Sequence, residues 1–112
     1  MLNCHCSDCR KANGSAYAPL VIVPKKAVKL QGEPRFHKVV GGSGKNVERG
    51  FCPNRGSQVI IRIEKLPDAL AIQAGTLDDP TVFNPSSDIY TDSAPPWDHM
   101  KPNTKKVPKG RS

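Results

Sequence analysis

The sequence predicts a single, mainly β domain with few or no helices. Three observations carry this prediction. The chain has 112 residues, a length that suits one small domain. It contains 11 prolines and 9 glycines, so turns are frequent. No segment keeps a 3.6-residue apolar period over three helical turns, whereas several short runs are rich in β-branched residues.

The expected strands are six short segments bounded by turn residues. Each is flanked by proline, glycine or polar residues that favour a change of direction. A glycine-rich connection at residues 41–44 indicates a hairpin between the third and fourth strands. Residues 7–12 are long enough for one helical turn. The six predicted strands are residues 17–23, 27–30, 35–40, 47–51, 58–63 and 69–74.

Composition divides the chain into a domain over residues 1–100 and a basic tail over residues 101–112. The tail has two prolines, one glycine and a single large apolar residue, so we expect it to be flexible. The net charge is +7, and residues 1–63 carry 11 Lys/Arg but 3 Asp/Glu. This basic part suits an anionic small molecule or a nucleic-acid backbone, and an ordinary solvated surface is the alternative.

Membrane insertion and secretion are not expected. The longest apolar cluster, residues 18–23, is interrupted by Pro19 and is far shorter than the roughly 18 residues of a spanning helix. The first residues do not resemble a signal peptide. We therefore expect a cytoplasmic protein, in which four reduced cysteines are more readily metal ligands or reactive thiols than disulfides.

Three cysteines, Cys4, Cys6 and Cys9, stand at C-x-C-x2-C spacing. A tight loop can aim three thiols so close together at one ion, and zinc accepts thiolates in a tetrahedral shell. Three protein ligands leave one position for water or a substrate thiol, which is typical of catalytic zinc. The spacing therefore predicts a zinc site. Buried inert cysteines and a metal-free reactive thiol cluster are the alternatives.

The neighbours of this cluster lead to further expectations. Arg10 and Lys11 are expected to lower the thiol pKa values and so favour thiolates. His5 lies between two ligand positions and is expected to point away from the ion, as a surface or packing residue. Near Cys52, Arg55 occupies the place of a second thiol, and a guanidinium cannot coordinate zinc. Cys52 is therefore a lone buried thiol or a fourth ligand for the same ion.

Five short motifs follow one another between residue 4 and about residue 97. They lie at residues 4–11, 14–16, 51–52 with 56–57, 75–80 and 96–97. In order and spacing they resemble the glutathione-dependent formaldehyde-activating enzyme (GFA) family, which also contains centromere protein V. The resemblance implies a β-tent fold of small curled antiparallel sheets and a zinc-dependent carbon–sulfur lyase. It also implies a catalytic zinc on Cys4, Cys6 and Cys9.

The sequence departs from the family pattern at several positions. The resemblance implies a second, structural zinc on an upstream C-x-C pair and on two thiols of a later segment, and only Cys52 of these four ligands is found. Arg55 replaces one of them, and because the given sequence begins just before Cys4, we expect the upstream hairpin of the family to be absent. We therefore expect at most one zinc per chain. A further departure is Asp88, where family members commonly carry a histidine.

The resemblance implies an activity like that of S-(hydroxymethyl)glutathione synthase, in which glutathione or another small thiol is taken up as thiolate and adds to formaldehyde. Arg10, Lys11 and Arg49 are candidates for binding the glutathione carboxylates, with plain surface charge as the alternative. If the hairpin is absent, the sheet edge that it would cover predicts a homodimer, and a start assigned too late in the sequence is the alternative. A non-catalytic zinc-binding relative is the alternative function. A nucleic-acid-associated module ranks third, because aromatic residues do not interleave the basic stretches.

Overall fold

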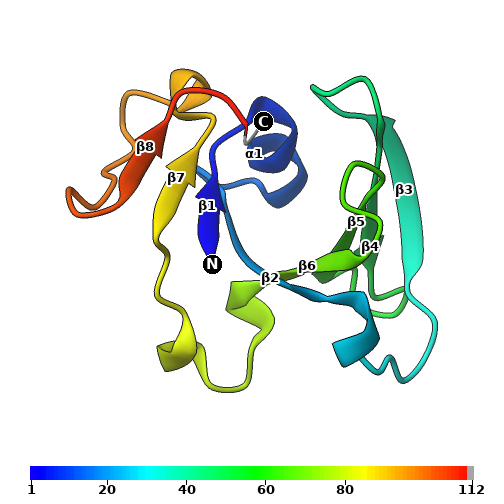
Figure 1. The fold of residues 1–112 in the computed structure, drawn as a ribbon. Coiled ribbons are helices and arrows are strands. Elements are labelled where there is room, and N and C mark those ends of the chain that lie inside the picture. Colours follow the sequence, from blue (N-terminus) through cyan, green and yellow to red (C-terminus); the bar gives the residue numbers. More distant parts are fainter. Residues whose placement is uncertain (111–112) are drawn as a thin grey trace. The chain divides into compact units, whose positions relative to one another are not determined.

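The computed structural model describes residues 1–110, which fall into two compact units. Residues 1–20 and 78–110 belong to the first unit, and residues 21–77 form the second. The strand β2 (Ala18–Pro24) runs across the division between them. Figure 1 traces the strands and the helix α1 along the chain. None of the helices in the described part of the chain has the length and apolar character needed to cross a bilayer.

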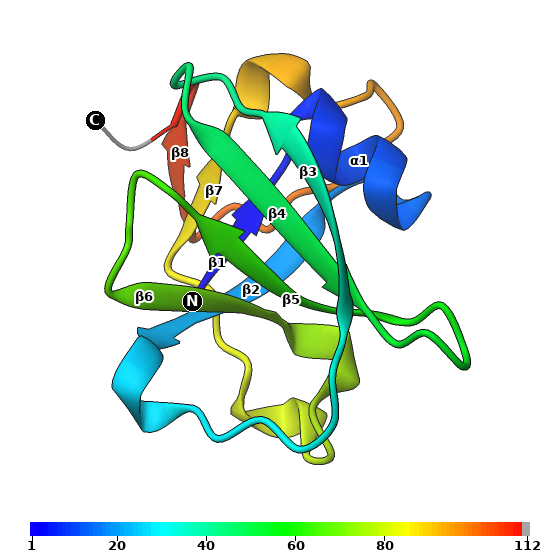
Figure 2. The same cartoon turned by 90° about the vertical axis from the view of Figure 1, so that its right-hand side faces the viewer.

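The second unit is an antiparallel meander of four strands, shown face-on in Figure 2. The strands are β3 (Arg35–Val40), β4 (Asn46–Phe51), β5 (Gln58–Ile63) and β6 (Ala69–Gln73), and short 3-10 turns lie at Lys25–Ala27 and Ala74–Thr76. β-branched residues of β5 and small or branched residues of β6 supply its core. The buried apolar residues of this unit are Ile60, Ile61, Leu70, Ala71 and Ala74.

Gly50 allows two strands of this unit to approach closely. A Cβ atom at this position would lie 2.7 Å from a side-chain carbon of Ile60 and 2.8 Å from one of Phe36. Only glycine leaves room for both neighbours. The register of β4 against β5 shifts directly after it, between Gly50 and Phe51.

The first unit combines three short strands with the start of β2 and one helix. The strands are β1 (Leu2–Cys4), β7 (Ser87–Ile89) and β8 (Lys105–Val107). β1 pairs antiparallel with β2 and parallel with β7, and β7 pairs parallel with β8, so segments from both ends of the chain lie side by side (Figure 1). Further 3-10 turns lie at Pro80–Val82 and Thr91–Ser93. The buried apolar residues are Leu2, Cys4, Cys9, Ala18 and Leu20.

The helix α1 (Ser7–Asn13) is short and is closed at both ends by its own sequence. The Cys6 sulfur accepts a hydrogen bond from the Cys9 N–H, 3.3 Å away, and so caps the first turn. Gly14 ends the helix in the left-handed conformation, with φ of 67°, and its N–H donates to the Arg10 carbonyl. The sequence predicted this segment as one helical turn, and the structure extends it by one residue.

The mainly β class is confirmed. Five of the six predicted strands correspond to β2, β3, β4, β5 and β6. Residues 27–30 do not form a strand, because the chain turns in a 3-10 helix at Lys25–Ala27 and then runs without regular pairing. The sheet pairing is antiparallel in the second unit but parallel at β1–β7 and β7–β8, so the expectation of purely antiparallel sheets is wrong there. These strands have three residues each, too few for an alternation pattern to reveal them.

The segment predicted as a flexible tail contains β8, which the composition did not indicate. Lys105 to Val107 pair in register with Ser87 to Ile89, and Thr104 is buried. Backbone hydrogen bonds hold such a strand without large apolar side chains, so its basic composition does not prevent it from packing. Residues 111 and 112 of the predicted tail lie outside the described residues.

A buried polar network centred on Asp88 joins β1, β7 and β8. The Asp88 side chain is 1% exposed, and its Oδ1 accepts hydrogen bonds from His5 Nε2 at 2.7 Å and from Asn3 Nδ2 at 3.1 Å. Its Oδ2 accepts from the Thr104 hydroxyl and lies 3.3 Å from Lys106 Nζ. On the other side of the His5 ring, Nδ1 lies 2.6 Å from Asp98 Oδ2. Both ring nitrogens of His5 therefore face carboxylates.

This network determines the charge state of Asp88. Burial alone would raise its pKa, but the hydrogen bonds that it accepts outweigh burial and lower the pKa from 3.8 to about 2. The four donors, in order of their effect, are Thr104, His5, Asn3 and Lys106. Asp88 is therefore an ionised, fully partnered carboxylate inside the first unit.

We predict that Asp88→Ala lowers the free energy of unfolding by roughly 3–5 kcal/mol, because it leaves His5 and the other donors buried without their acceptor. Urea unfolding of the purified, chelated protein measures this loss. Asp92→Ala is the matched control, because Asp92 is 61% exposed and lies 3.9 Å from Lys109. We expect this variant to change stability by about 0.5 kcal/mol or less. Equal losses in both variants would contradict the prediction.

The depressed pKa of Asp88 also predicts acid sensitivity. A carboxyl group that is harder to protonate when folded stabilises the fold above its unfolded pKa of 3.8, and this contribution disappears as the pH falls toward about 2. Its full size is roughly 2 kcal/mol. The stability difference between the wild type and Asp88→Asn should therefore shrink between about pH 5 and pH 2. A difference that stays constant over this range would show that the charge of Asp88 is not involved.

Candidate metal centre

Three sulfur atoms gather at the junction of β1 and α1. The Sγ atoms of Cys4, Cys6 and Cys9 all lie within 4.8 Å of one another. A tetrahedral zinc shell with bonds of about 2.3 Å places neighbouring sulfurs about 3.8 Å apart. Cys4 and Cys9 are buried and Cys6 is half-buried, so the cluster has one partly open side. The spacing and softness of these donors fit a zinc ion.

Each of the three cysteines is positioned by local structure. Cys4 ends β1, where it pairs with Ala18 of β2 and Ile89 of β7. The next N–H, from His5, donates to the Ile89 carbonyl at 2.9 Å and fixes the direction in which the chain leaves the strand. Cys6 caps α1 and Cys9 lies three residues later, so one helical turn places their sulfurs on the same side.

The crowding of the three thiols controls their protonation. Hydrogen bonds with the Cys6 and Cys9 side chains, burial, and the charges of these neighbours raise the pKa of Cys4 far above its ordinary value. The expectation that Arg10 and Lys11 would lower the thiol pKa values is therefore wrong for Cys4, because its thiol neighbours and burial dominate. Three thiolates at this distance need a positive charge among them, and a divalent cation supplies it.

His5 is a packing residue. Its side chain is fully buried, its ring centroid lies 5.0 Å from that of Tyr17, and its nitrogens face Asp88 and Asp98. It does not belong to the cluster of possible metal ligands found among residues 1–110. This agrees with the prediction that the imidazole points away from the ion, and it excludes the surface location that the sequence left open.

The other candidate site residues lie outside the cluster. Arg10 and Lys11 occupy the last turn of α1, where Arg10 is half-buried and Lys11 exposed. Arg49 belongs to β4 of the second unit and is 7% exposed. Its low exposure leaves little of its surface free to meet a ligand.

Cys52 also belongs to the second unit, where it is half-buried in a tight turn. Its N–H donates to the Ser57 carbonyl at 2.9 Å, and its own carbonyl accepts from the Gly56 N–H at 2.7 Å. Hydrogen bonds from the backbone of Arg55 and Asn54, together with the Arg55 charge, lower the pKa of the Cys52 thiol. Cys52 was predicted as a lone buried thiol or a fourth ligand, and the turn leaves its side chain partly exposed instead of buried.

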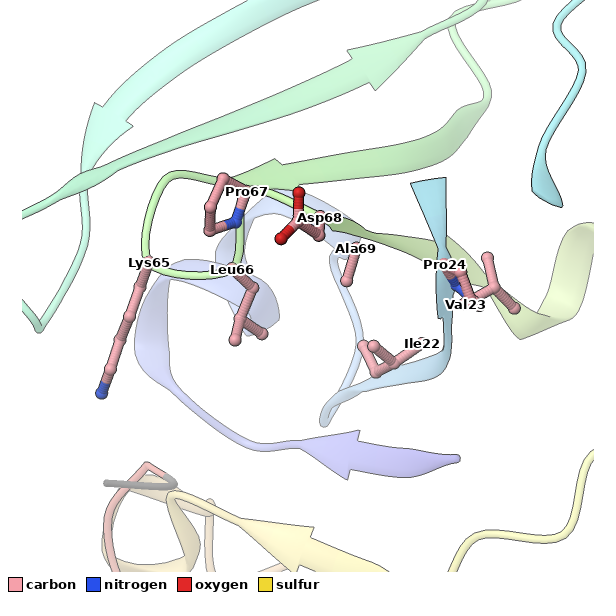
Figure 3. A pocket seen from close by; sticks show the side chains of 8 residues that line it. All are labelled: Ile22, Val23, Pro24, Lys65, Leu66, Pro67, Asp68 and Ala69. Carbon is pink, nitrogen blue, oxygen red and sulfur yellow. The ribbon is translucent and has the colours of Figure 1, made fainter. Parts of the chain in front are cut away.

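A hollow of about 420 Å³ in the second unit offers no comparable chemistry. Figure 3 shows Ile22, Leu66 and Ala69 directed toward one space, while the Lys65 side chain extends away from it. The residues that line the hollow are Ile22, Val23, Pro24, Lys65, Leu66, Pro67, Asp68 and Ala69. They include no cysteine or histidine, so the hollow lacks the donor set of the cysteine cluster.

The sequence indicated no role for two residues of the first unit, Asp98 and Tyr90. Asp98 carried no signal, because its contact with His5 joins residues 93 positions apart. Tyr90 belongs to none of the predicted strands. The pKa of its phenol is raised by burial and by the negative charge of Cys4, Cys6 and Cys9. Asp88 was noticed as a departure from a family pattern, but its role needed the structure.

Comparison with known proteins bears on this centre directly. The sequence profile of the family described as glutathione-dependent formaldehyde-activating enzyme matches residues 1–93. The match includes β1, α1 and β7, and hence all three cysteines of the cluster, Asp88 and Tyr90. A search of the curated proteins returned no relative that matches the chain. Because the profile covers most of the sequence, the chain belongs to the glutathione-dependent formaldehyde-activating enzyme family.

Proposed function

We propose that this protein is a zinc-dependent carbon–sulfur lyase that joins the thiol of glutathione, or of a related small thiol, to formaldehyde. The observation that carries the proposal is the gathering of Cys4, Cys6 and Cys9 within 4.8 Å in a member of this family. Three thiolate ligands form an incomplete tetrahedral shell. That arrangement is typical of zinc sites at which a substrate binds.

The three cysteines and His5 have different roles in this proposal. Cys4, Cys6 and Cys9 would hold the zinc ion, which when bound would accept a substrate thiol and favour its thiolate form. The contacts of His5 with Asp88 and Asp98 keep the segment between Cys4 and Cys6 in place. The half-buried side of the cluster at Cys6 is where we expect the substrate to enter.

The reaction requires little of the protein besides binding and positioning the two reactants. The sulfur of the thiolate adds to the carbonyl carbon of formaldehyde, a carbon–sulfur bond forms, and the electron pair of the C=O π bond moves to oxygen. The proton released by the thiol returns through solvent to that oxygen, which gives the S-hydroxymethyl hemithioacetal. Holding the two reactants together supplies much of the acceleration in such a bimolecular addition.

Arg10 suits the binding of a glutathione carboxylate. It follows Cys9 directly in α1, and its Nε is a buried atom without a hydrogen-bond partner among residues 1–110. An unpartnered guanidinium donor favours an anionic ligand. Lys11, exposed on the same turn, would add attraction at longer range.

We predict that the purified protein holds one zinc ion per chain, and that Cys9→Ser releases it, because a serine hydroxyl is a poor replacement for thiolate. Elemental analysis after dialysis measures the metal. Cys52→Ser is the matched control, since Cys52 is not a member of the cluster, and we expect it to keep the ion. Loss of zinc from Cys52→Ser would make Cys52 a ligand, and two ions per chain would contradict the expected stoichiometry.

We predict that the zinc-loaded wild type forms the glutathione–formaldehyde adduct faster than the uncatalysed background. Cys9→Ser and chelated protein should fall to that background, whereas Cys52→Ser should keep the wild-type rate. Following the adduct by NMR at equal reactant concentrations measures the difference. If wild type, Cys9→Ser and chelated protein react at one rate, a non-catalytic zinc-binding relative is the better description.

The expected homodimer and the expected cytoplasmic location stay predictions. Light scattering at micromolar concentration tests the assembly, and a monodisperse species of 12.2 kDa would contradict the dimer.

A further inference from the structure

The strand β3 forms a free edge of the second unit. It pairs with β4 over its whole length, and it is the last strand at its end of the sheet. Across residues 1–110 no strand pairs with its other side, and Figure 2 shows it along the outer side of the meander. A strand edge of this kind presents a row of N–H and C=O groups to which another extended chain can pair.

The register shows which backbone groups of β3 face the free edge. At the turn after β3, the Gly41 N–H donates to the Lys45 carbonyl at 2.8 Å. In an antiparallel ladder this orientation recurs at every second residue, so the odd-numbered residues of β3 direct their backbone groups at β4. On the other side of β4, the Glu64 N–H donates to the Asn46 carbonyl at 3.0 Å, which agrees with this alternation. The residues of β3 whose N–H and C=O groups face the free edge are therefore Phe36, Lys38 and Val40.

The side chains along this edge are basic. Arg35, His37 and Lys38 are exposed, and β3 contains no acidic residue. None of the three takes part in an ion pair in the described part of the chain, although Lys38 lies opposite Glu48 in the register with β4. The second unit as a whole has ten Lys/Arg and four Asp/Glu. The positive charge of the edge is therefore not neutralised by its neighbours, and it favours an acidic partner.

Packing behind the edge holds β3 in position. The Phe36 ring is half-buried, and the central carbon of the Arg62 guanidinium lies over it, 3.9 Å from the ring centre. Gly50, opposite Phe36 in the register, leaves room for the ring. At the end of the strand, Val40 is 66% exposed and offers an apolar contact beside the basic residues. An edge that is fixed before binding loses little conformational entropy when a partner pairs with it.

Two other occupants suit this edge less well. A second copy of the chain, paired antiparallel on β3, would place basic side chains opposite basic side chains, which destabilises a strand pair. The phosphates of a nucleic acid would match the charge, but they only accept hydrogen bonds and would leave the outward carbonyls of β3 without donors. An extended acidic peptide supplies backbone donors, backbone acceptors and negative charge together.

We propose that the free edge of β3 binds an extended acidic segment of a partner protein by strand addition. The backbone of the segment pairs with Phe36, Lys38 and Val40. Its carboxylates meet the exposed side chains of Arg35, His37 and Lys38. This surface belongs to the second unit and contains no residue of the cysteine cluster, so the inference does not rest on the proposed function.

The first test measures charge recognition by the purified full-length protein. Calorimetry with a short capped peptide of alternating glutamate and threonine residues gives the affinity, and we expect the same peptide with lysine in place of glutamate not to bind. Lys38→Glu should weaken binding of the acidic peptide roughly three- to tenfold, because a repulsion replaces an attraction. Lys26→Glu is the matched control: it makes the same change of charge at an exposed residue outside β3 and should bind within about twofold of the wild type.

The second test measures strand pairing. Val40→Pro removes an N–H from the free edge, while the odd-numbered residues of β3 keep their hydrogen bonds to β4. We expect this variant to bind the acidic peptide roughly three- to tenfold more weakly, the effect of one hydrogen bond. Val40→Thr keeps the N–H and should bind like the wild type. An N-methylated form of the acidic peptide keeps its charge but has no backbone donors, so the wild type should not bind it.

Loss of binding in Lys38→Glu, in Val40→Pro and with the N-methylated peptide, while both control variants bind normally, is the expected result. If Val40→Pro does not fold, the N-methylated peptide decides the question on the wild type. Equal binding of the methylated and unmethylated peptides would show attraction of charge without strand pairing and would overturn the inference.

Three further results would also overturn it. The first is an acidic peptide that does not bind at all. The second is a single-stranded oligothymidylate that binds more tightly and displaces the peptide, which would make nucleic acid the occupant. The third is a dimer in light scattering that Val40→Pro converts to a monomer, which would make a second copy of the chain the occupant.

Discussion

The buried pair of His5 and Asp88 is the interaction on which the first unit depends. His5 stands between two cysteines of the cluster, so fixing its ring fixes the backbone on both sides. A buried carboxylate that loses its partners keeps its desolvation cost without compensation, so β7 has to lie where Asp88 reaches β1. The parallel pairing of β1 with β7 satisfies this requirement, and it also brings Ile89 beside Cys4.

The same arrangement assigns cation binding and stabilisation of the fold to different side chains. Gathering three thiols is electrostatically costly, as the raised pKa of Cys4 shows, and a cation offsets this cost once it binds. The frame around the thiols must therefore be stable before the cation arrives. Hydrogen bonds to Asp88 provide that stability without using the sulfurs, and with His5 engaged by two carboxylates the ring does not compete as a ligand.

The features that depend on residues close together in the sequence could be predicted. Cys4, Cys6 and Cys9 lie within six residues, so their spacing alone indicated the cluster, and the longer strands showed β-branched runs bounded by turns. The contacts between distant segments could not be read in this way. Thr104 and Lys106 reach Asp88 from a segment whose apolar content predicts a loose tail, and polar side chains with this role have no periodic pattern. Asp98 pairs with His5 for the same nonlocal reason.

The conformation of Tyr90 connects the end of the chain to the cysteine cluster. A left-handed tyrosine persists only where its surroundings supply more stabilisation than the conformation costs, and here the Lys109 carbonyl and the backbone at Gly110 supply it. Only a residue without Cβ can approach the phenol at this point, which gives Gly110 a specific packing role. Order in residues 108–110 is therefore a condition for the position of the phenol. The end of the chain thus supports the residue that follows Ile89, the partner of Cys4 in the parallel ladder.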